Sequence, residues 1–188
     1  AEAANTLGRF RAREAFGSLT AALEDPRVEV RLEVTQSLVV LVGVEALRPV
    51  LRMSRHVSQW TAIELSMIVG RFKDTAAPYL VEALRSKDKS VVIFCVAMLA
   101  EIGFVTAVEP LLLLAELNQD PEVLGKVLEA LGRLGDMRSK TLMKKFLHDD
   151  TESVRLKAIE AMGRIGGEEV VQVLQANLLS PAFDEKVV

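Results

Sequence analysis

The sequence has few of the residues that build metal centres, disulfides and nucleophilic sites. Its 188 residues include one cysteine, Cys95, and two histidines, His56 and His148. A single cysteine excludes an intrachain disulfide, and no spacing of cysteine and histidine resembles a zinc site. We therefore expect no metal and no cofactor, and we expect the cytoplasm as the default compartment.

The sequence also has no excess of basic residues, few aromatic residues and few long apolar runs. The formal net charge is −3, which gives no general positive field for holding phosphates. The most apolar stretch, Val91 to Ala100, is too short to cross a bilayer, which takes about 20 residues, so we expect no transmembrane segment. Aromatics make up 5% of the chain and hydrophobic residues 50%, a balance that favours closely packed helices over disorder.

What the sequence does contain is an apolar position that recurs about every 31 residues. The six anchors are Phe10, Leu41, Phe72, Ile102, Leu134 and Ile165, and four of them directly follow a Gly-Arg pair. A period of about 20–50 residues with helical patterning indicates a solenoid, in which each unit buries its apolar face against its neighbours.

Each repeat is predicted to hold a longer first helix and a shorter second helix. In the last complete repeat, Val154, Ala158 and Met162 recur at helical spacing, and Gly166-Gly167 can take the positive φ that ends a helix. Asp25-Pro26 and Asp120-Pro121 favour first-helix starts, as do the N-cap oxygens of residues 149–151. The first helices are expected at Val28–Leu41, Ser58–Phe72, Ser90–Ile102, Glu122–Leu134 and Ser153–Ile165, and the second helices at Arg13–Leu23, Glu45–Met53, Thr75–Leu84, Ala107–Leu117, Ser139–Leu147 and Glu168–Leu179.

Three segments carry a resemblance to a known repeat family. They are Asp25-Pro26 with Val30-Arg31, the Ala-Leu-Gly-Arg-Leu-Gly of residues 130–135, and the Ala-Val-Glu-Pro-Leu of residues 107–111. In them the chain resembles HEAT-like repeats, closest to the short type of phycobilisome chromophore lyases, over essentially its whole length. The resemblance implies an all-α, right-handed superhelical solenoid of about six helical pairs, with first helices outside and second helices lining a concave face.

The repeat boundaries predict one solenoid. The expected units are 1–25 (partial), 26–55, 56–88, 89–120, 121–150 and 151–180, with 181–188 starting another. Because the chain begins inside a helical pattern and ends where a new repeat would start, we expect it to be a fragment of a longer protein.

One departure from the family pattern concerns an arginine on the first helix, which in the family often pairs with a turn aspartate. The matching positions here are Arg31, Ala62, Val92, Leu124 and Arg155. The middle repeats are therefore expected to join by apolar packing more than by charge-assisted hydrogen bonds.

No residue pattern predicts catalysis, so we expect the chain not to be an enzyme. His56 and His148 are about three repeats apart, which at about 10 Å per stacked helix pair separates them by roughly 30 Å. The acidic run 149–152 lacks the glycine bend of a calcium loop and is interpreted as a helix start. Residues 132–136 end a helix instead of following a strand, which argues against a phosphate loop.

The third repeat has a first helix that is apolar on every face. Overlaid on the fifth repeat, Val92 and Phe94 stand where Arg155 and Lys157 are expected to face water. One interpretation is that isolated apolar residues on a surface are ordinary. The other is that Val92, Phe94 and Phe104 form an outer apolar patch covered by a partner, a second copy of the chain or another part of the parent protein.

The resemblance implies a protein-binding scaffold, because most members of the family are scaffolds, and its concave face is where a protein or peptide partner would lie. The alternatives are an accessory role in a bilin lyase and weak nucleic-acid binding through Arg138, Lys140, Lys144 and Lys145, which the net acidic charge opposes. The concave candidates are Arg48, Arg52, Glu82, Glu109, Leu113, Lys145 and Gln172.

Overall fold

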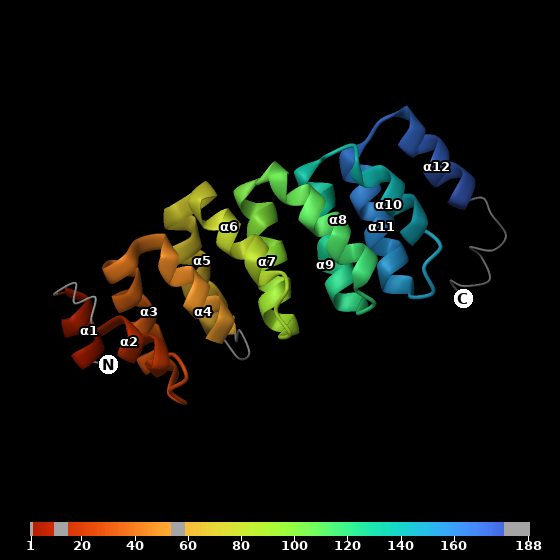
Figure 1. Cartoon of the computed structure of the whole chain (residues 1–188). Helices are drawn as coiled ribbons and strands as arrows, with labels where there is room; N and C mark the ends of the chain where they lie inside the picture. The colour runs from red at the N-terminus through yellow and green to blue at the C-terminus, as the bar shows by residue number, and fades with distance from the viewer. Residues whose placement is uncertain (1, 10–14, 54–58, 179–188) are drawn as a thin grey trace. The chain divides into compact units, whose positions relative to one another are not determined.

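The computed structural model of the chain describes residues 2–9, 15–53 and 59–178, and every regular element in these ranges is a helix (Figure 1). The first helices of the repeats are α1 (Glu2–Arg9), α3 (Val28–Val42), α5 (Gln59–Phe72), α7 (Lys89–Ile102), α9 (Pro121–Leu134) and α11 (Glu152–Ile165). The second helices are α2 (Phe16–Ala22), α4 (Leu47–Met53), α6 (Ala77–Ala83), α8 (Val108–Leu117), α10 (Ser139–Phe146) and α12 (Glu168–Leu178).

The predicted all-α class and the predicted helices are confirmed, with bounds that agree to within about two residues. The parts of the predictions at 13–14, 58 and 179 lie outside the described residues. The helix end predicted at Gly166-Gly167 is also confirmed, since these residues have φ of 70° and 100°.

Short 3-10 turns precede three of the second helices, where the sequence predicted α-helix. They are η2 (Gly43–Ala46), η3 (Lys73–Ala76) and η4 (Val105–Ala107). Each is followed by a proline near the start of the α-helix, namely Pro49, Pro78 and Pro110. Proline has no N–H to donate to the carbonyl four residues earlier, and that carbonyl lies in the 3-10 turn in every case. The α-helices therefore begin only after these turns, at Leu47, Ala77 and Val108, one or two residues before the proline.

The chain divides into two compact units, Ala1–Met98 and Leu99–Val188. In the first unit, the fully buried large side chains include Leu38, Leu47, Leu51, Leu65 and Leu80. In the second unit they include Leu111, Leu128, Leu131, Met143 and Met162. Both sets come from first and second helices alike, so each unit is held together by the apolar faces of its helix pairs.

The aspartates before the first helices cap them less often than the sequence predicted. Asp120 is the N-cap of α9 and accepts bonds from the N–H groups of Glu122 and Val123 at 2.9 and 3.3 Å. Asp25 accepts instead from the N–H of Arg27, itself the N-cap of α3. Asp149 accepts in the same way from Thr151, whose own side chain makes no cap bond. The predicted capping by Asp25 and Thr151 is therefore wrong. Asp25 and Asp149 each stand two residues before the N-cap and accept from its N–H, which forms an Asx turn.

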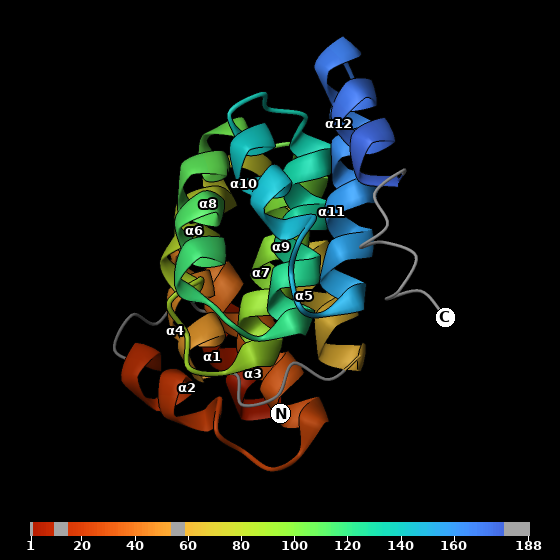
Figure 2. The ribbon, with the colours of Figure 1, turned by 90° about the vertical axis from the view of Figure 1, so that its right-hand side faces the viewer.

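The helices α9 and α11 lie side by side in both views (Figures 1 and 2) and approach closely at Gly132. A Cβ on Gly132 would lie 2.7 Å from the Cα of Ala161. In the part of the chain that the structure describes, the equivalent glycine one repeat later, Gly163, has no such neighbour within 4 Å. The close approach of α9 and α11 therefore requires a glycine at position 132.

The two first-helix arginines that match the family pattern bind backbone carbonyls of the preceding turn. Arg31 donates from Nη1 to the carbonyls of Asp25 and Pro26 at 2.8 and 3.0 Å. Arg155 donates in the same way to Asp149 and Asp150 at 2.9 and 3.1 Å. Although charged, Arg155 is only 7% exposed. This repeat position is thus an inner one, where a charge satisfies turn carbonyls.

The predicted outer apolar patch of the third repeat is wrong. Val92 is 4% exposed and Phe94 7% exposed, so both belong to the core. The overlay on Arg155 misled the prediction, because that position is buried even when it holds a charge. Phe104 is half-buried, and its N–H donates to the carbonyl of Leu99 just after Gly103, which has φ of 76°. This is a Schellman end of α7, in which an apolar residue after the glycine packs back on the helix.

One described stretch, Val28–Arg52, is long and apolar enough to span a membrane by length and composition, with a mean hydropathy of 1.5 in its most apolar window. That window is 56% buried inside the structure, and Gly43, with φ of 65°, ends α3 within the stretch. These properties are those of a core helix pair, and they are weak evidence for a span.

Candidate interaction surface on the second helices

The candidates predicted for the concave face all lie on second helices and are all exposed. They are Arg48 and Arg52 on α4, Glu82 on α6, Glu109 and Leu113 on α8, Lys145 on α10 and Gln172 on α12. We call the surface that they mark in each unit the second-helix face of that unit. In the first unit, three of these residues are in mutual contact.

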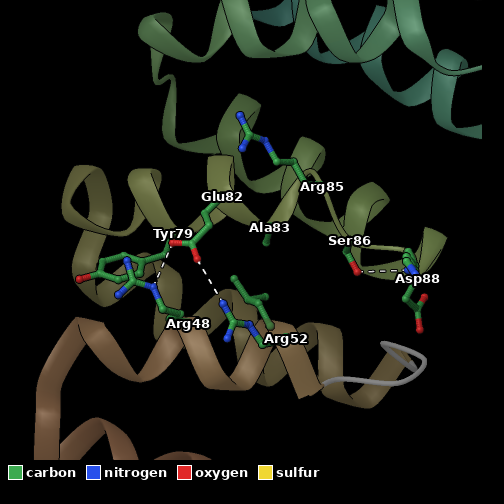
Figure 3. A pocket seen from close by; sticks show the side chains of 10 residues that line it. Arg48, Arg52, Tyr79, Glu82, Ala83, Arg85, Ser86 and Asp88 are labelled. Carbon is green, nitrogen blue, oxygen red and sulfur yellow. Dashed lines mark hydrogen bonds and ion pairs between the residues drawn. The ribbon is translucent and has the colours of Figure 1, made fainter.

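In the first unit, two arginines of α4 share one carboxylate of α6 (Figure 3). The Nε of Arg48 lies 3.0 Å from Oε2 of Glu82, and an Nη2 atom of Arg52 lies 3.7 Å from Oε1. The guanidinium carbon of Arg48 also lies 5.4 Å from the centroid of the Tyr79 ring, within the range of a cation–π contact. Arg48 is thus held from two sides, whereas Arg52 is held loosely and is 72% exposed.

An open cleft of about 510 Å³ runs between α4 and α6 beside this triad. Leu51, which is buried, and Ala83 supply its apolar floor. The turn after α6 adds further polar side chains, and Figure 3 shows Arg85 pointing away from the triad. The charged and aromatic side chains that line the cleft are Arg48, Arg52, Tyr79, Glu82, Arg85, Lys87 and Asp88.

Sequence reasoning missed Tyr79, Arg85 and Lys87 as parts of this surface. Comparison of equivalent repeat positions selects one or two residues per helix and ignores the turns between helices. One available signal was that Tyr79 is the only tyrosine in the chain. Tyr79 directly precedes Leu80 on α6, and Arg48 of α4 covers its ring.

In the second unit the second-helix face has a different chemistry. Leu113 and Leu117 follow each other at i and i+4 on α8 and are 53% and 75% exposed. At the start of the same helix, Oε2 of Glu109 lies 3.7 Å from Nη1 of Arg138, the N-cap of α10. Lys145 is exposed near the end of α10. This face therefore combines an apolar stripe with a single ion pair and a lysine.

Arg138 is held mainly by its own turn. Its Nη2 lies 2.7 Å from Oδ2 of Asp136, and its backbone N–H also donates to that carboxylate. Hydrogen bonds from the Arg138 side chain, and then from its backbone, lower the pKa of Asp136 from 3.8 to about 2. In the first unit Arg27 lowers the pKa of Asp25 below its usual range by the same pair of bonds. The two units therefore repeat this turn motif.

The four basic residues weighed for nucleic-acid contact do not form one exposed cationic surface. Lys140 is only 7% exposed. Arg138 is engaged with Asp136 and Glu109, and Lys144 is half-buried. Lys145 is exposed, which leaves too short a row of cations to follow a phosphate backbone.

The described residues offer little for metal or thiolate chemistry. No group of three or more histidine, cysteine and acidic side chains in this part of the chain is placed to hold a metal ion. Burial raises the pKa of the Cys95 thiol to about 12, so the thiol stays protonated at neutral pH. His148 is exposed, and His56 lies outside the described residues.

Comparison with known families gives one finding for fold. Residues 108–186 match the family model described as HEAT repeats, which supports HEAT-like repeats in this part of the chain. The matched residues start at α8 and include the helices α9 to α12. No curated protein matches the chain.

Proposed function

We propose that the chain is a non-catalytic protein-interaction module, a scaffold or regulatory element that presents its second-helix face to a polypeptide partner. One observation carries the proposal. At equivalent repeat positions, the second helices expose Arg52, Glu82, Leu113 and Lys145, so the surface chemistry changes at every repeat while the backbone stays the same. HEAT repeats generally mediate binding between proteins, and the match over residues 108–186 supports that use.

The mixed order of charges and apolar side chains favours a polypeptide over a uniform polymer. A nucleic acid or an acidic polysaccharide presents one sign of charge along its whole length and would meet Glu82 and Glu109 unfavourably. A polypeptide can place a different side chain opposite each repeat. The helices hold these exposed residues in fixed positions, which reduces the entropy lost when a partner binds.

The finer family assignment belongs to the same proposal. The period of about 31 residues and the Ala-Leu-Gly-Arg-Leu-Gly of residues 130–135 support the short HEAT-like type found in chromophore lyases.

The test is a peptide-display selection followed by titration of matched variants. Peptides from a random display library are selected on the immobilised chain and then titrated against a triple variant, Arg52→Ala, Leu113→Ala and Lys145→Ala. Removing three exposed side chains from the second-helix face should lower the affinity for a selected peptide by about tenfold or more. Circular dichroism should show unchanged helix content, because all three residues are exposed.

The matched control removes two arginines and one leucine from first helices instead, through Arg71→Ala, Arg133→Ala and Leu156→Ala. These three side chains are also exposed. The control should bind like the unmodified chain. Selection of no peptide, or equal loss in both triple variants, would show that the second-helix face is not the binding surface.

A further inference from the structure

The cleft between α4 and α6 carries positive charge in a chain that is acidic as a whole. Among the residues that the structure describes, four cationic and two anionic side chains line it, a net charge of +2, whereas the whole chain has a formal net charge of −3. A local excess of charge opposite in sign to that of the chain attracts a partner of the complementary sign. The cleft therefore favours an anionic ligand.

The cations of the cleft retain donors for such a ligand. At 3.7 Å, the contact between Arg52 and Glu82 is longer than a hydrogen bond, so Glu82 does not use the planar donor edge of Arg52. Arg85 and Lys87 are exposed and form no ion pair with another described residue. Arg48, by contrast, is oriented by Glu82 and Tyr79 and gives the site a fixed cation.

The size and the floor of the cleft favour a peptide over a small ion. Its volume of about 510 Å³ lies within the range of about 300–1,000 Å³ that is usual for ligand sites, and Leu51 and Ala83 form its apolar base. An inorganic anion would use the guanidinium groups and leave that base uncovered. A peptide that alternates acidic and apolar side chains would use both.

The same cleft fits a nucleic acid poorly. Single strands bind by stacking bases on aromatic rings along a continuous cationic groove. Tyr79, the one aromatic ring among the described residues that line the cleft, is covered by Arg48, and the acidic side chains of Glu82 and Asp88 interrupt the cations. A peptide has backbone N–H groups that can face Glu82, whereas a phosphate backbone has none.

We infer that the cleft between α4 and α6 binds an extended acidic peptide segment of a partner protein. Its carboxylate pairs with Arg52, its apolar side chains pack on Ala83 beside the buried Leu51, and further acidic residues meet Arg85 or Lys87. The inference rests on the proposed function and names the partner chemistry for one part of the second-helix face.

Fluorescence anisotropy with defined probes tests the inference on the full chain. The probes are a short labelled peptide that alternates Glu and Leu, the same peptide with Gln in place of Glu, and a labelled oligothymidylate. We expect the Glu peptide to bind about tenfold more tightly than the Gln peptide. Arg52→Gln should reduce that preference to about twofold, because it removes the loosely held guanidinium. Glu82→Gln should strengthen binding of the Glu peptide a few-fold, since it removes the competing carboxylate.

The matched control is Lys145→Gln, which removes the exposed cation at the equivalent position of α10 in the second unit. It should leave the affinity for the Glu peptide unchanged. Equal binding of the Glu and Gln peptides, or no effect of Arg52→Gln, would overturn the inference. Tighter binding of oligothymidylate that also depends on Arg52 would assign the cleft to phosphates instead. If display selects non-acidic peptides that depend on Leu113, the proposed function stands and this inference alone fails.

Discussion

The second-helix faces of the two units are both built from short α-helices, but they expose side chains of different chemistry. In the first unit, Arg48 and Arg52 surround Glu82 beside an open cleft. In the second, Leu113 and Leu117 form an exposed apolar stripe on α8. Arg31 and Arg155, at equivalent positions of two first helices, bind turn carbonyls in the same way. The comparison indicates that the pairing of first and second helices recurs in both units, whereas the exposed second-helix positions distinguish one repeat from the next.

The largest expected effect tests the close packing of α9 on α11 in the second unit. Gly132→Ala places a Cβ 2.7 Å from the Cα of Ala161, a backbone atom that cannot move by a rotamer change. We expect a loss of about 1–3 kcal/mol in the free energy of unfolding, typical of overpacking. Gly163→Ala is the control, because it fills open space on a helix and should stabilise by up to about 1 kcal/mol. Urea unfolding followed by circular dichroism measures both, and equal effects would contradict the close approach of α9 and α11.

The second prediction concerns the arginines at equivalent first-helix positions, of which Arg155 is buried and Arg31 is half-buried. Arg155→Leu leaves the carbonyls of Asp149 and Asp150 without their guanidinium donor and should cost about 1–3 kcal/mol. Arg31→Leu should destabilise to a similar extent, since its contacts are the same. Urea midpoints of the two variants provide the measurement. A neutral effect in both would mean that apolar packing, as at Val92, fully replaces the hydrogen bonds.

The third prediction uses salt to sharpen the contrast between the two faces. Raising the salt concentration from about 0.05 to 0.5 M should lower the affinity for the Glu-Leu peptide several-fold, because exposed charges are screened within a few ångströms at high salt. Arg52→Gln should reduce this salt dependence, whereas Lys145→Gln should not. Anisotropy titrations at several salt concentrations give the slopes. A salt-independent affinity would place the contact on the apolar stripe of α8.

The smallest expected effect is on acid stability. The carboxylate of Asp136 has its pKa lowered from 3.8 to about 2, so its stabilising contribution is present above about pH 3.8 and is lost as the pH falls through about 2. Asp136→Asn should therefore flatten the decrease of Tm between pH 4 and 2. Asp25→Asn should act in the same direction, since Arg27 lowers that pKa by the same contacts. Both carboxylates are half-buried, at 21% exposure for Asp25 and 15% for Asp136, and still reach solvent, so raising the salt concentration should shrink the effect.

The sequence predicted the helices well because their signals are local. Apolar spacing, Gly166-Gly167 and Asp120-Pro121 all act within a few residues, and the structure has helix ends at these places. The 3-10 turns before α4, α6 and α8 were missed, although Pro49, Pro78 and Pro110 mark them. The positions of the prolines alone did not show how many of the preceding residues form a 3-10 turn instead of α-helix.

Burial and side-chain contacts were harder to predict, because they depend on neighbouring repeats. The charge on Arg155 suggested a water-facing position, and the same overlay then placed Val92 and Phe94 on the surface. The exposure of Arg52, Leu113 and Lys145 was predicted correctly from repeat equivalence. The contact of Arg48 with Tyr79 was not, because those residues hold different positions in neighbouring repeats.

The most direct measurement is an NMR titration of the arginine side chains with the Glu-Leu peptide. Arginine Nε–H signals report each guanidinium separately, so Arg48 and Arg52 in the first unit can be compared with Arg138 in the second. We expect the signals of Arg48 and Arg52 to shift with one common saturation curve while that of Arg138 stays unchanged. Equal shifts at Arg138, or no shift at Arg52, would contradict the assignment of acidic-peptide binding to the cleft between α4 and α6.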